Sequence, residues 1–93
     1  GGPEKIKRIG VCSGGAKPYD RELFEIIDKK IDGHIAGEII EPSIAQAKGV
    51  GYNYFSCGHY ATEVFGVQEL GKRIKSHFKD ALEVEFIDIP NIL

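Results

Sequence analysis

The sequence lacks the features that mark membrane proteins and secreted proteins. No apolar run among its 93 residues reaches the 18 or more residues that span a bilayer. The first residues do not place an apolar core after a charged region, as a signal peptide would. These absences predict a soluble, cytoplasmic protein.

Cysteine and positive charge are also scarce. The chain has two cysteines, Cys12 and Cys57, and a disulfide framework would need more cysteines and a secretory context, so we expect reduced thiols. The formal charge is -2 at pH 7, and the Lys and Arg residues are scattered. Without a basic field, neither nucleic acid nor a membrane is an expected partner.

The length fits one small domain, and no repeat, low-complexity tract or long linker interrupts it. We predict a single α/β unit over residues 3–93, and we interpret Gly1 and Gly2 as a linker or tag remnant. The predicted order of elements is β-α-β-α-β-α-β, which indicates a layered sheet with flanking helices and right-handed crossovers.

Four segments have the pattern of strands. The mostly apolar residues 9–12, which close the segment 5–12, are typical of a buried parallel strand. Residues 34–37 and the aromatic run 52–57 predict two further strands. Residues 82–86 alternate apolar and acidic side chains, which predicts a last strand at an edge of the sheet, with one face in water.

Three segments have the pattern of helices. The first follows Asp20 as N-cap, and its apolar stripe reaches Ile31 before Gly33 stops it. The second opens at Glu41 and Pro42, and Gly49 is expected just past its end. The third ends near residues 79–80, and its apolar face comprises Val64, Val67, Leu70, Ile74 and Phe78. Gly66 and Gly71 in this helix predict close packing against a neighbour.

The carboxyl ends of parallel strands are where ligands collect in α/β sheets. Three loops should converge there, at residues 12–13, 37–38 and 57–59. If the third helix begins near His59, then His59 and Glu63 project from one helical face at i and i+4. This spacing is expected about 0.3 times by chance in such a chain. Imidazole and carboxylate suit Zn, Mn, Fe or similar divalent ions.

The other candidate groups each have two interpretations. The turn Ser13, Gly14 and Gly15 matches no complete phosphate-binding fingerprint, and it is either an anion-binding loop or a tight turn without a ligand. In one interpretation, Glu38 and Glu41 line the pocket, as general base or as partner of a metal-bound group. In the other, Glu38 is a solvated surface residue and the charge of Glu41 favours a helix N-terminus.

The remaining cysteine and histidine side chains are expected to be structural. Cys57 beside His59 fits a thiolate nucleophile or, with Cys12, a soft metal site, but buried structural thiols are the simpler interpretation. We expect His34 in its strand and His77 late in its helix to serve the fold.

Four blocks in this order resemble the NIF-three-like dinuclear metal proteins, often labelled GTP cyclohydrolase I type 2 homologues. The blocks are Cys12-Ser13-Gly14-Gly15, Gly37-Glu38-Ile39-Ile40-Glu41, the run 58–67 that begins Gly58-His59-Tyr60-Ala61-Thr62-Glu63, and the ending 84–91. The resemblance implies that His59 and Glu63 are ligands of a two-metal centre. Tyr60 stands where many members have a second His.

The resemblance also implies that the chain corresponds to the C-terminal part of a longer two-part protein. The other ligands of the family, an adjacent His pair and an Asp, come from segments that this sequence does not contain. The N-terminal remainder is therefore an expected partner, with two divalent ions in the complete site.

The resemblance implies that the chain is part of a metal-dependent, hydrolase-like protein. We expect that protein to act on a nucleotide or another phosphorylated small molecule. The family also forms homo-oligomers, so a non-enzymatic assembly or interaction module is the alternative. A third interpretation is a plain anion-binding domain that uses the glycine loop without metal.

Overall fold

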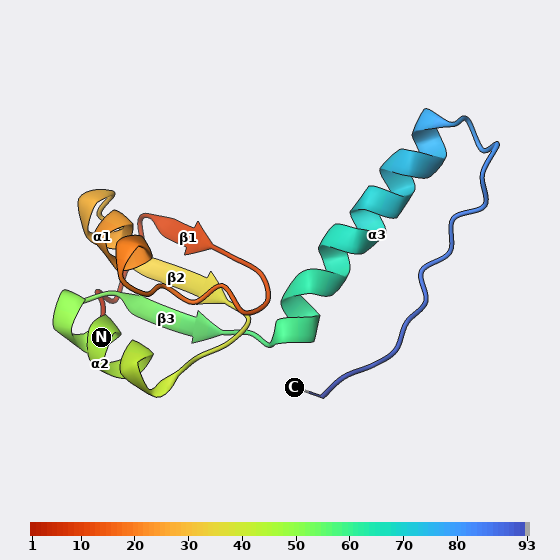
Figure 1. Cartoon of the computed structure of the whole chain (residues 1–93). Helices are drawn as coiled ribbons and strands as arrows, with labels where there is room; N and C mark the ends of the chain where they lie inside the picture. The colour runs from red at the N-terminus through yellow and green to blue at the C-terminus, as the bar shows by residue number, and fades with distance from the viewer. Residues whose placement is uncertain (93) are drawn as a thin grey trace.

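The computed structural model describes residues 1–92 and shows a small parallel sheet from which one long helix projects (Figure 1). The elements are β1 (Ile9–Val11), α1 (Arg21–Asp28), β2 (Gly33–Ala36), α2 (Glu41–Val50), β3 (Asn53–Ser56) and α3 (His59–His77). The α/β class and the order of these six elements confirm the sequence prediction. None of the helices within residues 1–92 is long and apolar enough to cross a membrane.

The three strands are parallel and lie in chain order, β1-β2-β3. Gly10 pairs with His34, which in turn pairs with Tyr54. This arrangement brings the carboxyl ends of all three strands to one edge of the sheet, where α3 begins.

The core is small and lies between the sheet and the first two helices. Ile26 of α1, Ala47 of α2 and Tyr52 form its buried cluster, and Leu23, Ile31 and Tyr54 pack against it. The prediction that residues 9–12 are buried was wrong, because Ile9 and Val11 of β1 remain 49% and 67% exposed. β1 is one of the two edge strands of the sheet, and little covers it.

Helix α1 ends at Asp28, so the expected continuation to Ile31 and the stop at Gly33 were wrong. Lys30 adopts a left-handed conformation with φ 52°. The Lys30 N–H donates to the Ile27 carbonyl, and the Ile31 N–H donates to the Ile26 carbonyl, which is the hydrogen-bond pattern of a Schellman motif. Gly33 instead begins β2.

Helix α2 opens at Glu41 and Pro42 as predicted, but Gly49 lies inside it. The helix continues to Val50, and Gly51 caps it with φ 87°. A left-handed residue at this position favours glycine because it has no Cβ. The Gly2 N–H also donates to the Asn53 side chain at 3.2 Å, so the first residues lie against β3.

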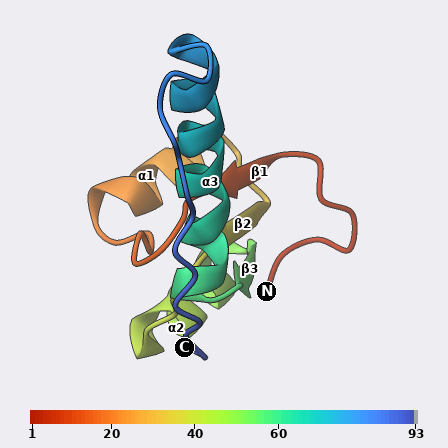
Figure 2. The same cartoon turned by 90° about the vertical axis from the view of Figure 1, so that its right-hand side faces the viewer.

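Helix α3 begins at His59 as predicted, and it buries none of its residues. After it, residues 81–92 run back along the helix in an extended conformation, as both views show (Figures 1 and 2). The predicted strand 82–86 is not formed, because it has no neighbouring strand within residues 1–92. A Cβ on Gly71 would lie 3.1 Å from Val84, which confirms close packing there, whereas Gly66 faces open space and that expectation was wrong.

These features make the molecule extended for its length. Its radius of gyration is 16.7 Å. A compact domain of this size would have a radius of about 12 Å. The difference arises from α3 and residues 81–92, which extend beyond the sheet and its core.

Candidate functional site

The three loops at the carboxyl edge of the sheet converge, as the sequence predicted. The Cys12 N–H donates to Ile35 at 2.9 Å, and the Cys57 N–H donates to Ala36 at 2.8 Å. One residue further on, the Gly58 N–H donates to the Gly37 carbonyl at 2.9 Å. These bonds extend the sheet pairing into the loops and place the start of α3 beside them.

Thr62 fastens the glycine loop to the first turn of α3. Its hydroxyl donates to the Gly58 carbonyl at 2.8 Å and accepts the Gly14 N–H at 2.8 Å. A Cβ on Gly37 would lie 2.3 Å from the Gly14 carbonyl oxygen and 2.7 Å from the Thr62 hydroxyl. Only glycine therefore fits at position 37.

His59 and Glu63 face each other at the start of α3. His59 Nε2 lies 3.2 Å from Glu63 Oε1, and the two side chains are 45% and 51% exposed. The other ring nitrogen, Nδ1, lies 2.6 Å from Glu38 Oε1. The imidazole is thus held between two carboxylates that come from separate parts of the chain.

Glu38 is itself held at three points. Its Oε1 contacts His59, its Oε2 accepts a hydrogen bond from Lys17 Nζ at 3.0 Å, and its backbone carbonyl accepts one from the Tyr54 hydroxyl at 2.6 Å. Lys17 also donates to the Gly15 carbonyl at 3.2 Å. These contacts fix the direction of the Glu38 carboxylate.

The charges of this cluster reinforce one another. The hydrogen bond to Glu38 raises the pKa of His59 above its ordinary value, and burial opposes the rise in part. Hydrogen bonds from His59 and then from Lys17 lower the pKa of Glu38. Glu38 therefore carries its negative charge at neutral pH.

The glycine loop lies directly against the pair. Gly14 has φ 61°, and a Cβ there would lie 2.1 Å from Glu63 Oε1 and 3.0 Å from His59 Nε2. The Gly14 N–H is already used by Thr62. The interpretation of Ser13, Gly14 and Gly15 as an anion-binding loop stays a prediction. Because the Gly14 N–H donates to Thr62, an anion would have to be bound by other groups of the loop.

Glu41 is not part of the cluster. It lies exposed at the first position of α2, and no hydrogen bond or ion pair among residues 1–92 links it to His59 or Glu38. Its place in the first turn agrees with the simpler interpretation, in which its charge favours the helix N-terminus.

The cysteines and the other two histidines also lie outside the cluster. Both thiols are free, and Cys57 is exposed, so its expected burial was wrong. His34 is 5% exposed and packs 5.6 Å from the Tyr54 ring, whereas His77 packs against Phe78 at 5.0 Å. Each of these histidines thus packs against an aromatic ring and makes no contact with His59 or Glu63 among the hydrogen bonds and ion pairs of residues 1–92.

The donor set fits one side of a metal site. His59 Nε2 and Glu63 Oε1 offer an imidazole nitrogen and a carboxylate oxygen at the spacing of two ligands that share an ion. Within residues 1–92, however, no three His, Cys, Asp or Glu side chains are grouped to hold a metal ion. The described residues can supply two ligands but not a closed coordination shell.

Comparisons with known proteins agree on one family. Residues 1–92 match the sequence model described as Duf34/NIF3 (NGG1p interacting factor 3). A protein called GTP cyclohydrolase 1 type 2 homolog in Pasteurella multocida is 37% identical over 96% of this chain and 34% of its own length. The protein of that name in Pseudomonas aeruginosa is 38% identical over 95% of this chain and 33% of its own length.

A solved structure is also similar. The protein described as ybgI, of unknown function, superposes with a TM-score of 0.81 at 34% sequence identity. The superposition covers 97% of this chain and 34% of that one. The chain therefore spans about a third of the length of its relatives.

Proposed function

Because this chain belongs to the Duf34/NIF3 family, we propose that it supplies part of a divalent-metal site in a hydrolase-like protein. His59 and Glu63 are the ligands in this proposal. Glu38 orients His59, and the glycine loop borders the space in front of the pair.

The observation that carries the proposal is the contact between His59 Nδ1 and Glu38 Oε1 at 2.6 Å. A neutral imidazole has one N–H and one free lone pair. When Nδ1–H donates to Glu38, the lone pair is on Nε2, which is the nitrogen beside Glu63. Metal-ligating histidines commonly donate their second nitrogen to a carboxylate in this way.

Two ligands give weak binding, so the remaining ligands and the second ion are proposed to come from the rest of the longer protein. Relatives are about three times as long as this chain, which leaves ample sequence for them. Zn, Mn and Fe suit the two donors.

Such an ion, when bound, would act as a Lewis acid that polarises a substrate oxygen. The residues of this chain hold the ligands and the glycine loop around the ion's position. Lys17 and Tyr54 hold Glu38, Glu38 holds the imidazole, and Thr62 holds the glycine loop against the first turn of α3. A nucleotide or another phosphorylated small molecule is the proposed substrate, with its anionic group at the Ser13–Gly15 turn.

Titration of the chain with Mn²⁺, followed by electron paramagnetic resonance, tests the ligands. His59→Ala and Glu63→Ala are each expected to weaken binding by at least about tenfold, because each removes one of two protein ligands. Glu38→Gln is expected to weaken binding about 10-fold to 100-fold, as for partners that orient a ligand.

His77→Ala and Glu69→Ala are matched controls, because they remove the same side chains from exposed positions of α3 outside the cluster. Their Mn²⁺ affinity should equal that of the wild type. If His59→Ala and Glu63→Ala bind Mn²⁺ as tightly as these controls, the proposal is wrong.

A further inference from the structure

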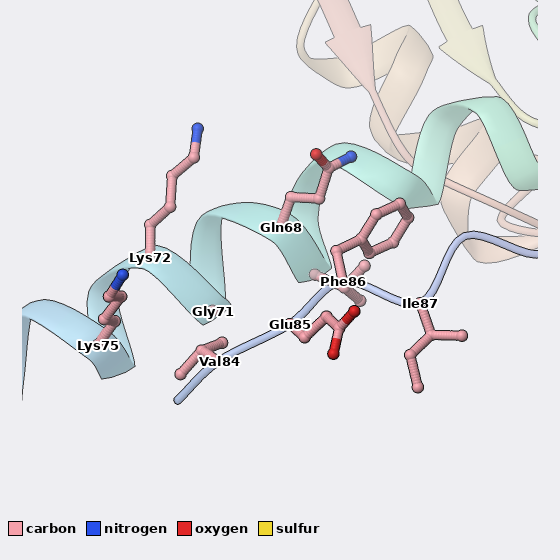
Figure 3. A pocket seen from close by; sticks show the side chains of 9 residues that line it. Gln68, Gly71, Lys72, Lys75, Val84, Glu85, Phe86 and Ile87 are labelled. Carbon is pink, nitrogen blue, oxygen red and sulfur yellow. The ribbon is translucent and has the colours of Figure 1, made fainter. Parts of the chain in front are cut away.

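An open groove lies between helix α3 and the extended segment 81–92. The groove has a volume of about 490 Å³. Its walls include Val67, Gln68, Gly71, Val84, Phe86 and Ile87 (Figure 3). Phe86 projects toward the helix beside Gln68, whereas the Glu85 carboxylate points away from it.

The extended segment has the backbone of a strand without a partner. Residues 82–89 make no backbone–backbone hydrogen bond with any other of residues 1–92. An extended stretch with free N–H and C=O groups is a template for another strand. The alternating pattern that predicted a strand is thus present, but no neighbouring strand within residues 1–92 forms hydrogen bonds with it.

The helix is wider than the single segment that lies along it. A helix with its side chains is about 10 Å across, whereas strands are spaced about 4.8 Å apart, so one strand covers about half of a helical face. Leu70 and Phe78 accordingly remain 58% and 50% exposed. The uncovered half has the width of one more strand.

The exposed area supports the same conclusion. The chain exposes 7192 Å². A compact monomer of 10.2 kDa would expose about 5,300 Å². The excess, about 1,900 Å² on this one chain, is larger than the roughly 800 Å² that each partner buries in a standard protein–protein interface.

The charge of the segment restricts what can pair with it. Residues 81–93 contain Glu83, Glu85 and Asp88 but no Lys or Arg. A second copy of the segment would bring six carboxylates together, whereas opposite charges across a strand pair are favourable. Lys72 and Lys75 line the helix side of the groove, so the complementary strand directs apolar residues at α3 and carries its Lys or Arg opposite Glu83 and Glu85.

We infer that residues 82–87 and the adjacent face of α3 form a docking edge for such a strand, supplied by the part of the longer protein that this chain does not match. The similar structure superposes over 97% of this chain, which includes α3 and most of residues 81–92, and its own chain is about three times as long. The arrangement that lacks a partner here thus recurs in a protein with additional chain to cover it.

A synthetic peptide tests the chemistry of the edge. The probe is acetyl-Lys-Val-Lys-Val-Lys-Val-Lys-amide, and the control replaces each Lys by Glu. In the wild-type chain, the Lys peptide should bind at least about tenfold more tightly by calorimetry and should slow amide hydrogen exchange within residues 82–88. In the double variant Glu83→Lys, Glu85→Lys, the preference should reverse. Equal affinity for both peptides, or protection confined to other residues, would overturn the inference.

Two further measurements test the occupant. Light scattering of the chain alone should give a monomer, and a dimer with residues 82–88 protected would show that a second copy is the occupant instead. In the intact Pasteurella multocida relative, the amides that match residues 82–88 should exchange much more slowly than in the 93-residue chain. Equally fast exchange in both would exclude the longer protein as the source of the strand.

Discussion

At the scale of single residues, the sequence identified the central pair and Glu38, but not the residues that hold Glu38 and the glycine loop. His59 and Glu63 were predicted from a helical spacing that can be seen in the chain itself, and the structure brings them within 3.2 Å. Lys17, Tyr54 and Thr62 were missed because their contacts depend on how loops from different strands meet. Thr62 had a visible signal, since it lies within the block from Gly58 to Glu63.

Gly14 combines a left-handed backbone with a position directly against the side chains of His59 and Glu63. Gly14→Ala is expected to lower the free energy of unfolding by about 1 to 2 kcal/mol, because a Cβ disfavours a left-handed backbone. It should also weaken Mn²⁺ binding, because the new methyl group would displace the Glu63 carboxylate. Urea denaturation and the Mn²⁺ titration measure the two effects.

Gly66→Ala is the matched control for this substitution. Gly66 lies inside α3 with open space around its Cα, so alanine there should raise the free energy of unfolding by up to about 1 kcal/mol. A Gly14→Ala variant that is as stable as the wild type and retains its Mn²⁺ affinity would contradict the close contact.

At the scale of elements, the existence and order of helices and strands were predictable, but several ends were not. Helix α1 stops because Lys30, which is not a glycine, adopts a left-handed conformation. In α2, Gly51 rather than Gly49 provides the cap, and both glycines looked suitable in the sequence. The last strand failed to form for a different reason, since pairing requires a neighbour that local sequence cannot supply.

Strand β2 contains a buried histidine with an energetic cost. Neither ring nitrogen of His34 makes a hydrogen bond of good geometry within residues 1–92, and the Ala16 backbone offers it only a weak one. Burial lowers the pKa of His34, although the Ala16 backbone opposes the shift in part. Because the unfolded chain binds the proton more readily, stability is complete above the ordinary pKa near 6.5 and falls as the pH decreases toward the lower folded pKa.

His34→Phe should therefore stabilise the chain by about 1 to 2 kcal/mol at pH 8, because it removes unpartnered buried polar atoms. The advantage over the wild type should grow as the pH falls from 6.5 to 5.5. Urea denaturation at several pH values measures this difference. A difference that is constant with pH would show that His34 titrates alike in the folded and unfolded chains.

At the scale of the whole molecule, stability is unevenly distributed. The buried cluster of Ile26, Ala47 and Tyr52 lies beside the sheet, whereas α3 has no buried residue. The sequence predicted one α/β unit, but it could not show that the apolar stripe of α3 would lack a covering surface. Amphipathic periodicity reports that a face is apolar and does not report what packs on it.

Native-state hydrogen exchange should reveal this division. Amides in α3 and in residues 82–89 are expected to open with a lower free energy than amides in β2, because few apolar contacts hold them. The amides of β2, the central strand, should exchange only through global unfolding. One common opening free energy for β2 and α3 would contradict this prediction and indicate a single cooperative unit.

The register of the parallel sheet also has a kinetic consequence. Gly10 pairs with His34 and His34 with Tyr54, so each step of the sheet joins segments that are neighbours in sequence order. His59 and Glu38 can meet only after β2 and β3 are aligned, because they follow the ends of these two strands. Contacts made after the rate-limiting step slow unfolding and leave the folding rate unchanged. If aligning β2 with β3 limits the rate of folding, the polar cluster at the sheet edge governs how long the folded chain persists rather than how quickly it forms.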